Sequence, residues 1–358
     1  MNNSRIDKVI EAMKKENLSQ MIVTSTPAIF YLTGKIIHAG ERMIALYINA
    51  NGDKKFVVNK LVPVENCGDI DLVWYDDIED GVEVLSKFTD KNSPMGIDKD
   101  WKAHFLIRLM ELKGAKGFVN STPIIEKLRM VKDEVEKELM IEASRINDEV
   151  MSEIVNCIND NSTEKEICRI ITEKYIEKGT QGNSFPSIVA YGANAADPHC
   201  SSGDNKVKAG DCIVIDMGCR KNNYCSDMTR TYFYKEVSDR HAEIYNIVLE
   251  ANKRAIKTVK PGVKFCDVDN AARDYITEKG YGEYFTHRTG HCIGIEVHDF
   301  GNVSSVNEDI LEEGMIFSIE PGIYIKDDIG VRIEDLVMVT KDGCKRLNEY
   351  NKELKIIK

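Results

Sequence analysis

The sequence lacks any uninterrupted apolar run of about 20 residues, the length that a membrane-spanning helix requires. Its first stretch, from Met1 to Lys15, is polar and charged and has no apolar core of the kind found in signal peptides. The sequence also has fewer basic than acidic residues: 48 Lys and Arg and 59 Asp and Glu, which gives a net charge of -11. A nucleic-acid partner would require a basic face. We therefore expect a soluble cytoplasmic protein that binds neither nucleic acid nor membranes.

The ten cysteines include no CxxC pair, so the sequence gives no support for a structural zinc knuckle. They are scattered through a long chain without a signal peptide, and we interpret them as reduced thiols. The sequence also shows no repeat with a period of 20 to 50 residues and no low-complexity tract.

A chain of 358 residues exceeds the usual size of a single core, and we expect two domains. Residues 1–125 alternate short extended runs with helical stretches, which predicts a small α/β domain with a mixed sheet. From about 122 to 158, apolar residues recur at spacings of three or four, which predicts one long helix that opens the second domain. Residues 126–358 mix helices with strands and Gly-rich turns, so we expect an α+β architecture there.

Two aspartates lie in a predicted hairpin between Cys212 and Phe233. A two-residue turn at Lys221-Asn222 would place Asp216 directly opposite Asp227. Two carboxylates about 5 Å apart repel each other in a partly buried site unless a cation lies between them. On an arbitrary hairpin such a pair would lie on a solvated face, but Asp216 interrupts an apolar strand. The pair therefore indicates a metal site.

A second pair of carboxylates, Glu320 and Glu334, flanks another predicted hairpin. A three-residue turn at Lys326 to Asp328 would place the two glutamates opposite each other. Pro321 must interrupt the ladder beside them, because proline donates no hydrogen bond. On this pattern alone, surface glutamates at ordinary strand ends are nearly as good an explanation.

Histidines are concentrated between these two hairpins. The segment from Thr286 to Asp299 holds His287, His291 and His298, three of the seven histidines in the chain, and His199 lies in an earlier loop. The glycines beside them allow close backbone approach, which favours a site over separate structural roles. The odd spacing between His291 and His298 would place them on opposite faces of a strand unless a bulge intervenes.

Four carboxylates and one histidine form a hard, oxygen-rich ligand set with a charge of roughly -4. Two divalent ions would neutralise that charge. Such a set suits Mn²⁺, Co²⁺ or Zn²⁺ better than a metal that prefers thiolates. We predict a centre of two metal ions, with Mn²⁺ as the first choice.

Taken together, these motifs resemble the M24 metallopeptidases, the family of prolidase, aminopeptidase P and methionine aminopeptidase. The resemblance spans nearly the whole chain and implies a pita-bread catalytic domain behind a creatinase/prolidase N-terminal domain. The segments that carry it are DMG, SDMTRT, GHCIG, EPGIY and GVRIED. By this resemblance the metal ligands are Asp216, Asp227, His291, Glu320 and Glu334.

The resemblance also implies roles for residues around the metals. His199 and His298 would hold the substrate carbonyl and the tetrahedral intermediate, while Glu320 shuttles the proton. His287 and Arg332 resemble substrate-binding residues of aminopeptidase P. A homodimer is expected from the family.

The implied reaction is hydrolysis of the Xaa-Pro bond at the N-terminus of a proline-containing peptide. Methionine aminopeptidases lack the N-terminal domain, which disfavours that specificity. The segment His298 to Asn302 is closer to aminopeptidase P than to many prolidases, and an arginine that could grip a dipeptide's carboxylate is missing from it. The choice between dipeptides and longer peptides stays open. The alternatives are a catalytically inactive pita-bread module that binds peptides or proteins, and a hydrolase acting on another small amide.

Overall fold

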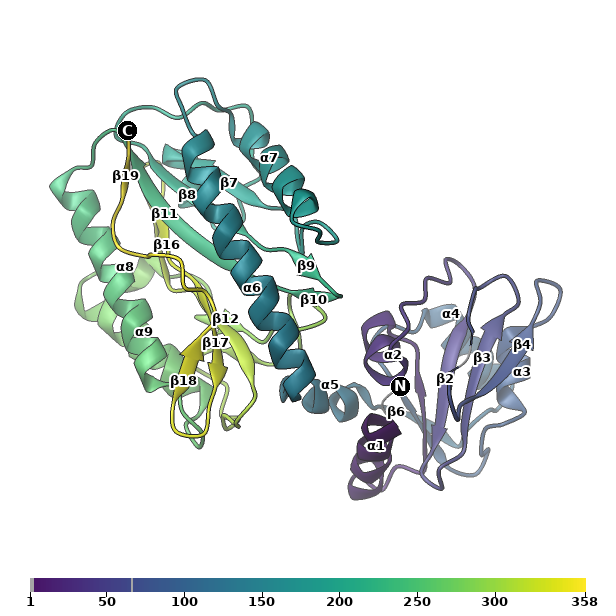
Figure 1. Cartoon of the computed structure of the whole chain (residues 1–358). Helices are drawn as coiled ribbons and strands as arrows, with labels where there is room; N and C mark the ends of the chain where they lie inside the picture. The colour runs from purple at the N-terminus through teal and green to yellow at the C-terminus, as the bar shows by residue number, and fades with distance from the viewer. Residues whose placement is uncertain (1–2, 66) are drawn as a thin grey trace. The chain divides into compact units, whose positions relative to one another are not determined.

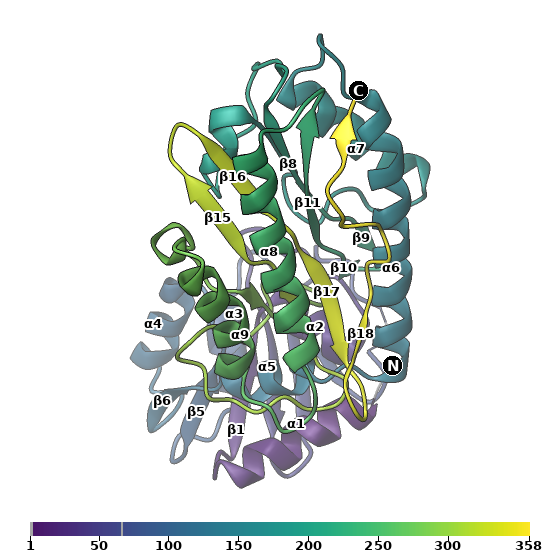
Figure 2. The same ribbon diagram turned by 90° about the vertical axis from the view of Figure 1, so that its left-hand side faces the viewer.

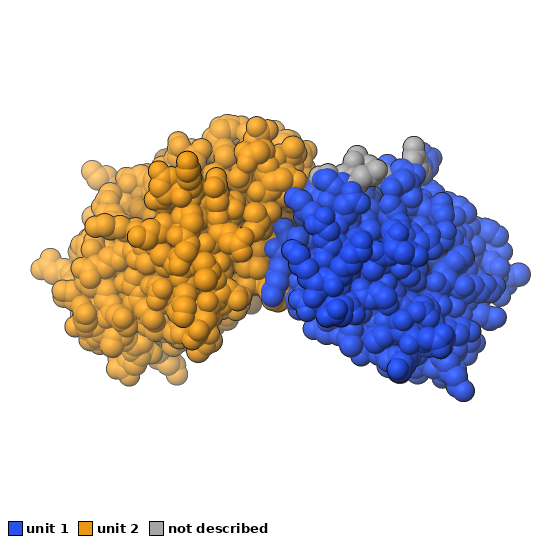
Figure 3. Space-filling view, turned by 90° about the horizontal axis from the view of Figure 1, so that it is seen from below, with its two compact units in different colours: residues 1–129 blue, residues 130–358 orange. Residues whose placement is uncertain are grey.

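The computed structural model describes residues 3–65 and 67–358. The chain divides into two compact units, residues 1–129 and 130–358, which Figure 3 colours separately. The elements up to the end of the first unit are α1 (Asn3–Lys15), β1 (Gln20–Val23), α2 (Thr26–Thr33), β2 (Ile44–Asn49), β3 (Lys54–Asn59), β4 (Asp71–Tyr75), α3 (Gly81–Ser86), β5 (Pro94–Ile97), α4 (Ala103–Glu111), β6 (Gly117–Asn120) and α5 (Thr122–Met130).

A six-stranded sheet with the order β4-β3-β2-β1-β5-β6 forms the centre of the first unit. β1 pairs antiparallel with β2 and parallel with β5, which confirms the predicted mixed sheet. The apolar side chains of Ile22 in β1 and Val57 in β3 are fully buried and pack with Leu85 of α3 and Leu109 of α4. This core explains why short apolar runs in this half of the sequence form strands.

The second unit follows α5 directly. None of the helices in the described part of the chain is both long and apolar enough to cross a membrane. The elements of the second unit are α6 (Glu134–Ile154), η1 (Val155–Cys157), α7 (Glu164–Glu177), β7 (Ile188–Tyr191), η2 (Gly192–Ala196), β8 (Cys212–Met217), β9 (Arg220–Lys221), β10 (Tyr224–Cys225), β11 (Met228–Tyr234), α8 (Asp239–Thr258), α9 (Phe265–Glu278), η3 (Gly282–Tyr284), β12 (Gly290–His291), β13 (Asn302–Val303), β14 (Ile316–Ile319), β15 (Gly322–Ile325), β16 (Ile329–Arg332), β17 (Asp335–Val339), β18 (Cys344–Arg346) and β19 (Ile356–Ile357).

The strands of the second unit lie between the α6–α7 pair and the α8–α9 pair (Figure 1). Strand β8 contributes to two hydrophobic cores, because successive side chains of a strand face opposite sides. Ile213 and Ile215 pack with α6 and α7, whereas Cys212 and Val214 pack with α8 and with β14 to β17. Figure 2 shows α8 running along β15 and β16. Asp216 shares the face of Cys212 and Val214, so it lies toward the interior of the unit.

The prediction of one long helix from about 122 to 158 is wrong in one respect. The structure has two helices there, α5 and α6, with a break between them. Val131 forms an antiparallel bridge with Met315, which takes it out of the helix. Asp133 then caps α6, because its carboxylate accepts from the N–H of Glu136 and the carboxylate of Glu136 accepts from the N–H of Asp133. The apolar period continues across this break, so periodicity alone did not reveal it.

Removing this cap has a measurable cost. We expect Asp133→Ala to lower the free energy of unfolding by about 1 kcal/mol, because the first turn of α6 loses a side-chain acceptor. Urea denaturation measures the loss. Glu138→Ala, on the exposed face of the same helix, changes stability by less than about 0.5 kcal/mol. Equal losses in the two variants would contradict the capping role.

The first predicted hairpin forms, but with a different register. Its turn lies at Asn222 and Asn223, one residue later than predicted, and both have positive φ, 48° and 69°. Asn tolerates this conformation, which the two-residue hairpin turn of type I′ requires. The register therefore shifts by two residues, and Asp216 lies opposite Thr229 rather than Asp227. A register shift of two residues leaves every side chain on the same face of the sheet. Asp216 and Asp227 therefore still lie on one face.

The second predicted hairpin forms in the predicted register. A three-residue turn joins β15 to β16, and Gly322 lies opposite Arg332. β14 and β17 continue with the same pairing after a gap in the ladder. Glu320 and Glu334 lie opposite each other in that gap, which Pro321 creates. The weaker of the two register arguments thus gave the correct pairing.

All ten cysteines are free thiols. Burial raises the pKa of Cys212, Cys225 and Cys292 to about 12 in each case. These thiols stay protonated at neutral pH, whereas metal binding and nucleophilic attack require the thiolate. The buried cysteines near the carboxylates therefore act as apolar packing residues.

Candidate active site

One cavity of about 610 Å³ in the second unit brings the predicted site residues together. Apolar side chains also line this cavity, namely Phe185, Ile188, Pro198 and Val297. The predicted residues that line it are His199, Asp216, Asp227, His287, His291, His298, Glu320, Arg332 and Glu334. The remaining lining residue is Arg288.

Each candidate ligand lies at or beside the end of a strand. Asp216 is in β8, Asp227 precedes β11, His291 ends β12, Glu320 follows β14 and Glu334 precedes β17. The strands must approach closely for these ends to meet. At Gly290 a Cβ atom would lie 1.9 Å from the carbonyl oxygen of Ser318, so only glycine lets β12 pack against β14.

Three of the residues form a compact cluster. Asp227, His291 and Glu334 offer ligand atoms that all lie within 4.8 Å of one another. Glu320 adjoins this cluster, with its Oε1 atom 3.4 Å from Nε2 of His291. Only 4% of the surface of Asp227 and 1% of that of Glu334 is exposed, so water does not compensate their charges.

Asp216 connects to the cluster through Arg332. The guanidinium donates from Nη2 to Oδ2 of Asp216 at 2.8 Å, from Nη1 to the Tyr324 hydroxyl and from Nε to Oγ1 of Thr229. The Thr229 hydroxyl in turn donates to Oε2 of Glu334 at 2.7 Å. One buried cation therefore holds carboxylates on two different hairpins in a fixed relation.

The carboxylates of the site lie close together, so their negative charges repel one another. The contacts with Arg332 and Thr229 offset this repulsion only in part. Burial raises the pKa of Asp227 well above its ordinary value, and the carboxylates of Glu334 and Asp216 add to the effect. Burial also raises the pKa of Glu334 well above its ordinary value and that of Glu320 to about 7. Asp216 Oδ1, Asp227 Oδ1 and Glu334 Oε1 are buried and have no hydrogen-bond partner among the described residues. Free carboxylate oxygens around one cavity, with His291 beside them, fit divalent cations.

Two histidines of the cavity, His287 and His291, are held neutral. Burial lowers the pKa of His291 to about 3, with a further contribution from nearby His298, and burial lowers that of His287 to about 4. Neutral imidazole is the form that binds a metal ion, and the carbonyl of Cys292 lies 3.2 Å from Nδ1 of His291. Nε2 of His291 is the atom nearest to the carboxylates.

His298 reaches the site by a route that strand alternation did not predict. β12 ends at His291, and the chain then forms a loop that turns back on itself, with the N–H of Asp299 donating to the carbonyl of Cys292. The rings of His291 and His298 consequently lie with their centroids 4.2 Å apart. The odd spacing of the two histidines was no obstacle, because they do not share a strand.

Sequence reasoning missed three residues of this region. Thr229 and Tyr324 anchor Arg332 inside the site, and Thr229 could have been found, because it lies two residues after Asp227 and so on the same face of the hairpin. Arg288 lines the cavity, is exposed, and its guanidinium makes no hydrogen bond or ion pair with the described residues. Its place between two of the clustered histidines was the available signal.

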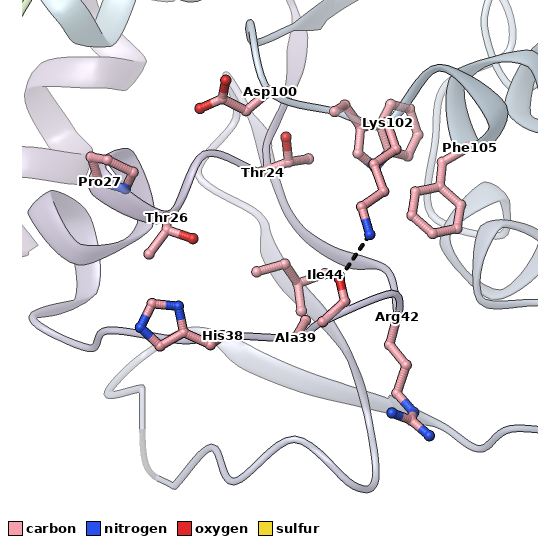
Figure 4. Close-up of a pocket in the computed structure, with 12 residues that line it drawn as sticks. Thr24, Thr26, Pro27, His38, Ala39, Arg42, Ile44, Asp100, Lys102 and Phe105 are labelled. Atoms are coloured by element: carbon pink, nitrogen blue, oxygen red, sulfur yellow. Dashed lines mark hydrogen bonds between the residues drawn. The ribbon is translucent and has the colours of Figure 1, made fainter. Parts of the chain in front are cut away.

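A second cavity, of about 470 Å³, lies in the first unit where β1 and β5 end (Figure 4). Its long cationic side chains are engaged within the unit: Nζ of Lys102 donates to the carbonyl of Gly40 at 2.7 Å, and Arg42 pairs with Asp77 at 2.8 Å. Asp100 is the single carboxylate among its lining residues. The candidate chemistry therefore lies in the second unit.

Known proteins are similar to this chain over nearly its full length. An Xaa-Pro dipeptidase from Pyrococcus horikoshii is 33% identical, over 98% of this chain and 99% of that protein. The crystal structure of a dipeptidase from Pyrococcus horikoshii OT3 has a TM-score of 0.93 at 36% identity, and the match covers 98% and 99% of the two chains. An X-Pro aminopeptidase from Thermotoga maritima gives a TM-score of 0.83 at 30% identity, covering 97% and 100%.

Two family descriptions match adjoining parts of the chain. Residues 5–131 match the creatinase/prolidase N-terminal domain, and residues 138–341 match metallopeptidase family M24. These matches confirm the predicted fold, an α/β N-terminal domain followed by a pita-bread catalytic domain. Members of this family use divalent metal ions, in agreement with the ligand set of the cavity. The chain therefore belongs to metallopeptidase family M24 and carries the N-terminal domain that creatinases and prolidases share.

Proposed function

We propose that this protein hydrolyses the Xaa-Pro bond of dipeptides at a centre of two divalent metal ions. The observation that carries the proposal is the set of buried carboxylate oxygens without partners around one cavity. Relatives that cover nearly the whole chain, and that are described as Xaa-Pro dipeptidases, support the substrate class. The ligands would be Asp216, Asp227, His291, Glu320 and Glu334.

Two bound divalent ions neutralise the ligand set and supply a Lewis acid and an activated water for peptide hydrolysis. The oxygen-rich ligands favour Mn²⁺, with Co²⁺ or Zn²⁺ as alternatives. We further propose that residues 126–358 carry this chemistry, that the protein is a homodimer and that it is cytoplasmic.

Glu320 is the proposed proton carrier. Its Oε1 atom accepts a hydrogen bond from the Ser318 hydroxyl at 3.1 Å, which orients the carboxyl group in the cavity. There it takes the proton of the attacking water and passes it to the nitrogen of the leaving proline. His199 and His298 line the same cavity and stabilise the negative charge that develops on the substrate carbonyl oxygen.

His287 and Arg332 are the proposed substrate-binding residues. Nε2 of His287 lies 2.9 Å from the Tyr324 hydroxyl, which also accepts from Arg332. This connection orients the His287 ring toward the same network that holds Asp216. Arg332 accordingly has two roles, one toward substrate and one in fixing the metal ligand.

Arg288 favours dipeptides over longer substrates. Its unpaired guanidinium at the cavity is suited to the free carboxylate of a C-terminal proline, which it can bind through two hydrogen bonds. Comparing the Mn²⁺-loaded protein on Ala-Pro and on Ala-Pro-Gly tests the choice. A higher kcat/KM for Ala-Pro is the expected result, and a preference for the tripeptide would assign the protein to the aminopeptidase type instead.

We expect Arg288→Met to raise the KM for Ala-Pro by roughly 10- to 100-fold, the cost of losing a hydrogen bond to a charged group. The KM for Ala-Pro-amide, which has no carboxylate, should change little. Arg169→Met, an exposed change on α7, serves as the control and leaves both values unaltered. Equal effects of Arg288→Met on the two substrates would contradict carboxylate binding.

All five ligand positions hold residues able to bind a metal, which argues against a catalytically inactive binding module. An Asp216→Ala protein as active as wild type would overturn the enzyme assignment. Full metal occupancy without cleavage of any proline peptide would indicate a hydrolase acting on another amide.

A further inference from the structure

Glu164 is a fully buried carboxylate in the first turn of α7, and it has no part in the chemistry proposed above. Its Oε1 atom accepts hydrogen bonds from the N–H of Tyr191 at 2.9 Å and from Nδ2 of Asn194 at 3.0 Å. Its Oε2 atom accepts from the N–H of Gly203 at 2.7 Å. A buried charge satisfied by so many donors fixes the groups that surround it, because losing any of them leaves the charge undercompensated.

These donors belong to one loop. Tyr191 ends β7, Asn194 lies in the short helix η2, and Gly203 lies on the far side of the loop. A single carboxylate therefore ties together both ends of the segment 192–203. The backbone of α7 adds a further contact, since the N–H of Lys165 donates to the carbonyl of Gly203 at 3.0 Å.

His199 lies in the middle of this loop and lines the cavity of the metal ligands. Its N–H donates to Oδ1 of Asp197, another residue of the same loop, at 2.9 Å. On its other side the loop rests on β16, where a Cβ atom at Gly330 would lie 1.6 Å from the carbonyl oxygen of Ala195. The loop is thus held between α7 and β16, and the position of His199 depends on both contacts.

We propose that Glu164 is a positioning residue that sets the place of His199 in the active site. The inference rests on the role proposed above for His199. A group that stabilises an oxyanion must lie within hydrogen-bond reach of the position that the charge will occupy. A displacement of about 1 Å can cost on the order of 100-fold in rate, so loosening one end of the loop is enough to impair catalysis.

Glu164→Gln tests the proposal with the smallest change of shape. The amide must place an NH₂ group against a backbone N–H on one side, which breaks the tie at one end of the loop. We expect kcat for Ala-Pro to fall by about 10-fold or more, with KM within about threefold of wild type and metal content unchanged. Glu166→Gln is the matched control, since Glu166 is exposed and caps the same helix through the N–H of Thr163.

A double-mutant cycle with His199→Ala separates positioning from general damage. If Glu164 acts through His199, Glu164→Gln lowers kcat by no more than about twofold in the His199→Ala protein. The same fold-loss in both backgrounds, or an unchanged kcat in the single variant, overturns the proposal. Should Glu164→Gln not fold, Asn194→Ala removes a side-chain tie from the loop and takes its place in the cycle.

Hydrogen exchange gives a readout that does not depend on activity. Amides of residues 192–203 should exchange faster in Glu164→Gln than in wild type, whereas those of α8 should not. Unchanged exchange in the loop would overturn the inference even in an active enzyme. A wild-type protein that fails to cleave Ala-Pro would instead overturn the proposed function, and the exchange result would still report whether Glu164 holds the loop.

Discussion

Asp227→Asn should lower kcat for Xaa-Pro hydrolysis by at least about 10³-fold and reduce the bound metal to one ion or none. Asp227 is one of three clustered ligands, and its ligand atom lies within 4.8 Å of ligand atoms on both His291 and Glu334. The amide keeps the size of the side chain but removes the charge that holds a cation. Activity should therefore be lost while the fold is retained.

Thermal unfolding with and without Mn²⁺ distinguishes loss of the metal site from damage to the fold. In metal-free protein, Asp227→Asn removes one of several crowded carboxylates, so its melting temperature should equal or exceed that of wild type. Added Mn²⁺ should raise the melting temperature of wild type but not of the variant. Asp327→Asn, in the exposed turn between β15 and β16, serves as the control and should behave as wild type does. A fully active Asp227→Asn protein with two bound ions would contradict the ligand assignment.

Asp335→Asn should produce the largest loss of stability, about 3–5 kcal/mol in the free energy of unfolding. Asp335 is completely buried and pairs with three cations. Nη1 of Arg346 lies 3.9 Å away, and two buried cations lie closer, Nη2 of Arg230 at 2.7 Å and Nζ of Lys352 at 2.5 Å. Removing its charge leaves these cations buried without compensation. Arg230 also donates to the carbonyl of Glu334, so this network supports the backbone of a metal ligand.

The pH dependence of this effect follows from the pKa of Asp335. Burial alone would raise that pKa, but Arg230 and Lys352 lower it below the ordinary value in the folded protein. The charge network therefore contributes its full stability above the ordinary aspartate pKa of about 3.9 and loses it as the pH falls through the lower folded-state pKa. Urea unfolding should give a constant difference between wild type and Asp335→Asn from pH 5 to 8. Asp342→Asn, an exposed change, should cost less than about 0.5 kcal/mol, and an equal loss there would contradict the account.

The two hairpins show which parts of this site a single sequence can predict. The hairpin turn predicted at Lys221-Asn222 placed Asp216 and Asp227 on one face, and that result is unaffected by an error of two residues in register. The turn position could have been found from the sequence, because Asn222 and Asn223 are the neighbouring pair that best tolerates positive φ at both positions. For Glu320 and Glu334, the three-residue turn gave the pairing correctly.

The rest of the site depends on loops, whose course has no period. His298 returns to His291 because the chain folds back after β12, and His199 is placed by a buried carboxylate in a different element. For Arg288 the sequence offered one signal, its place between His287 and His291, because an arginine alone does not indicate a site. The break between α5 and α6 also depends on a contact distant in sequence. The spacing of apolar residues is helical throughout, but the bridge that Val131 forms with Met315 interrupts the helix.

Metal titration of the metal-free protein, with hydrolysis of Ala-Pro followed at each addition, tests the central proposal most directly. The account predicts that Mn²⁺ binds with a stoichiometry of two ions per chain and that Ala-Pro cleavage appears as the sites fill. Cleavage should be absent in metal-free protein and restored on reloading. A chain that holds two ions without cleaving Ala-Pro, or that cleaves it at full rate with no metal bound, would contradict the account.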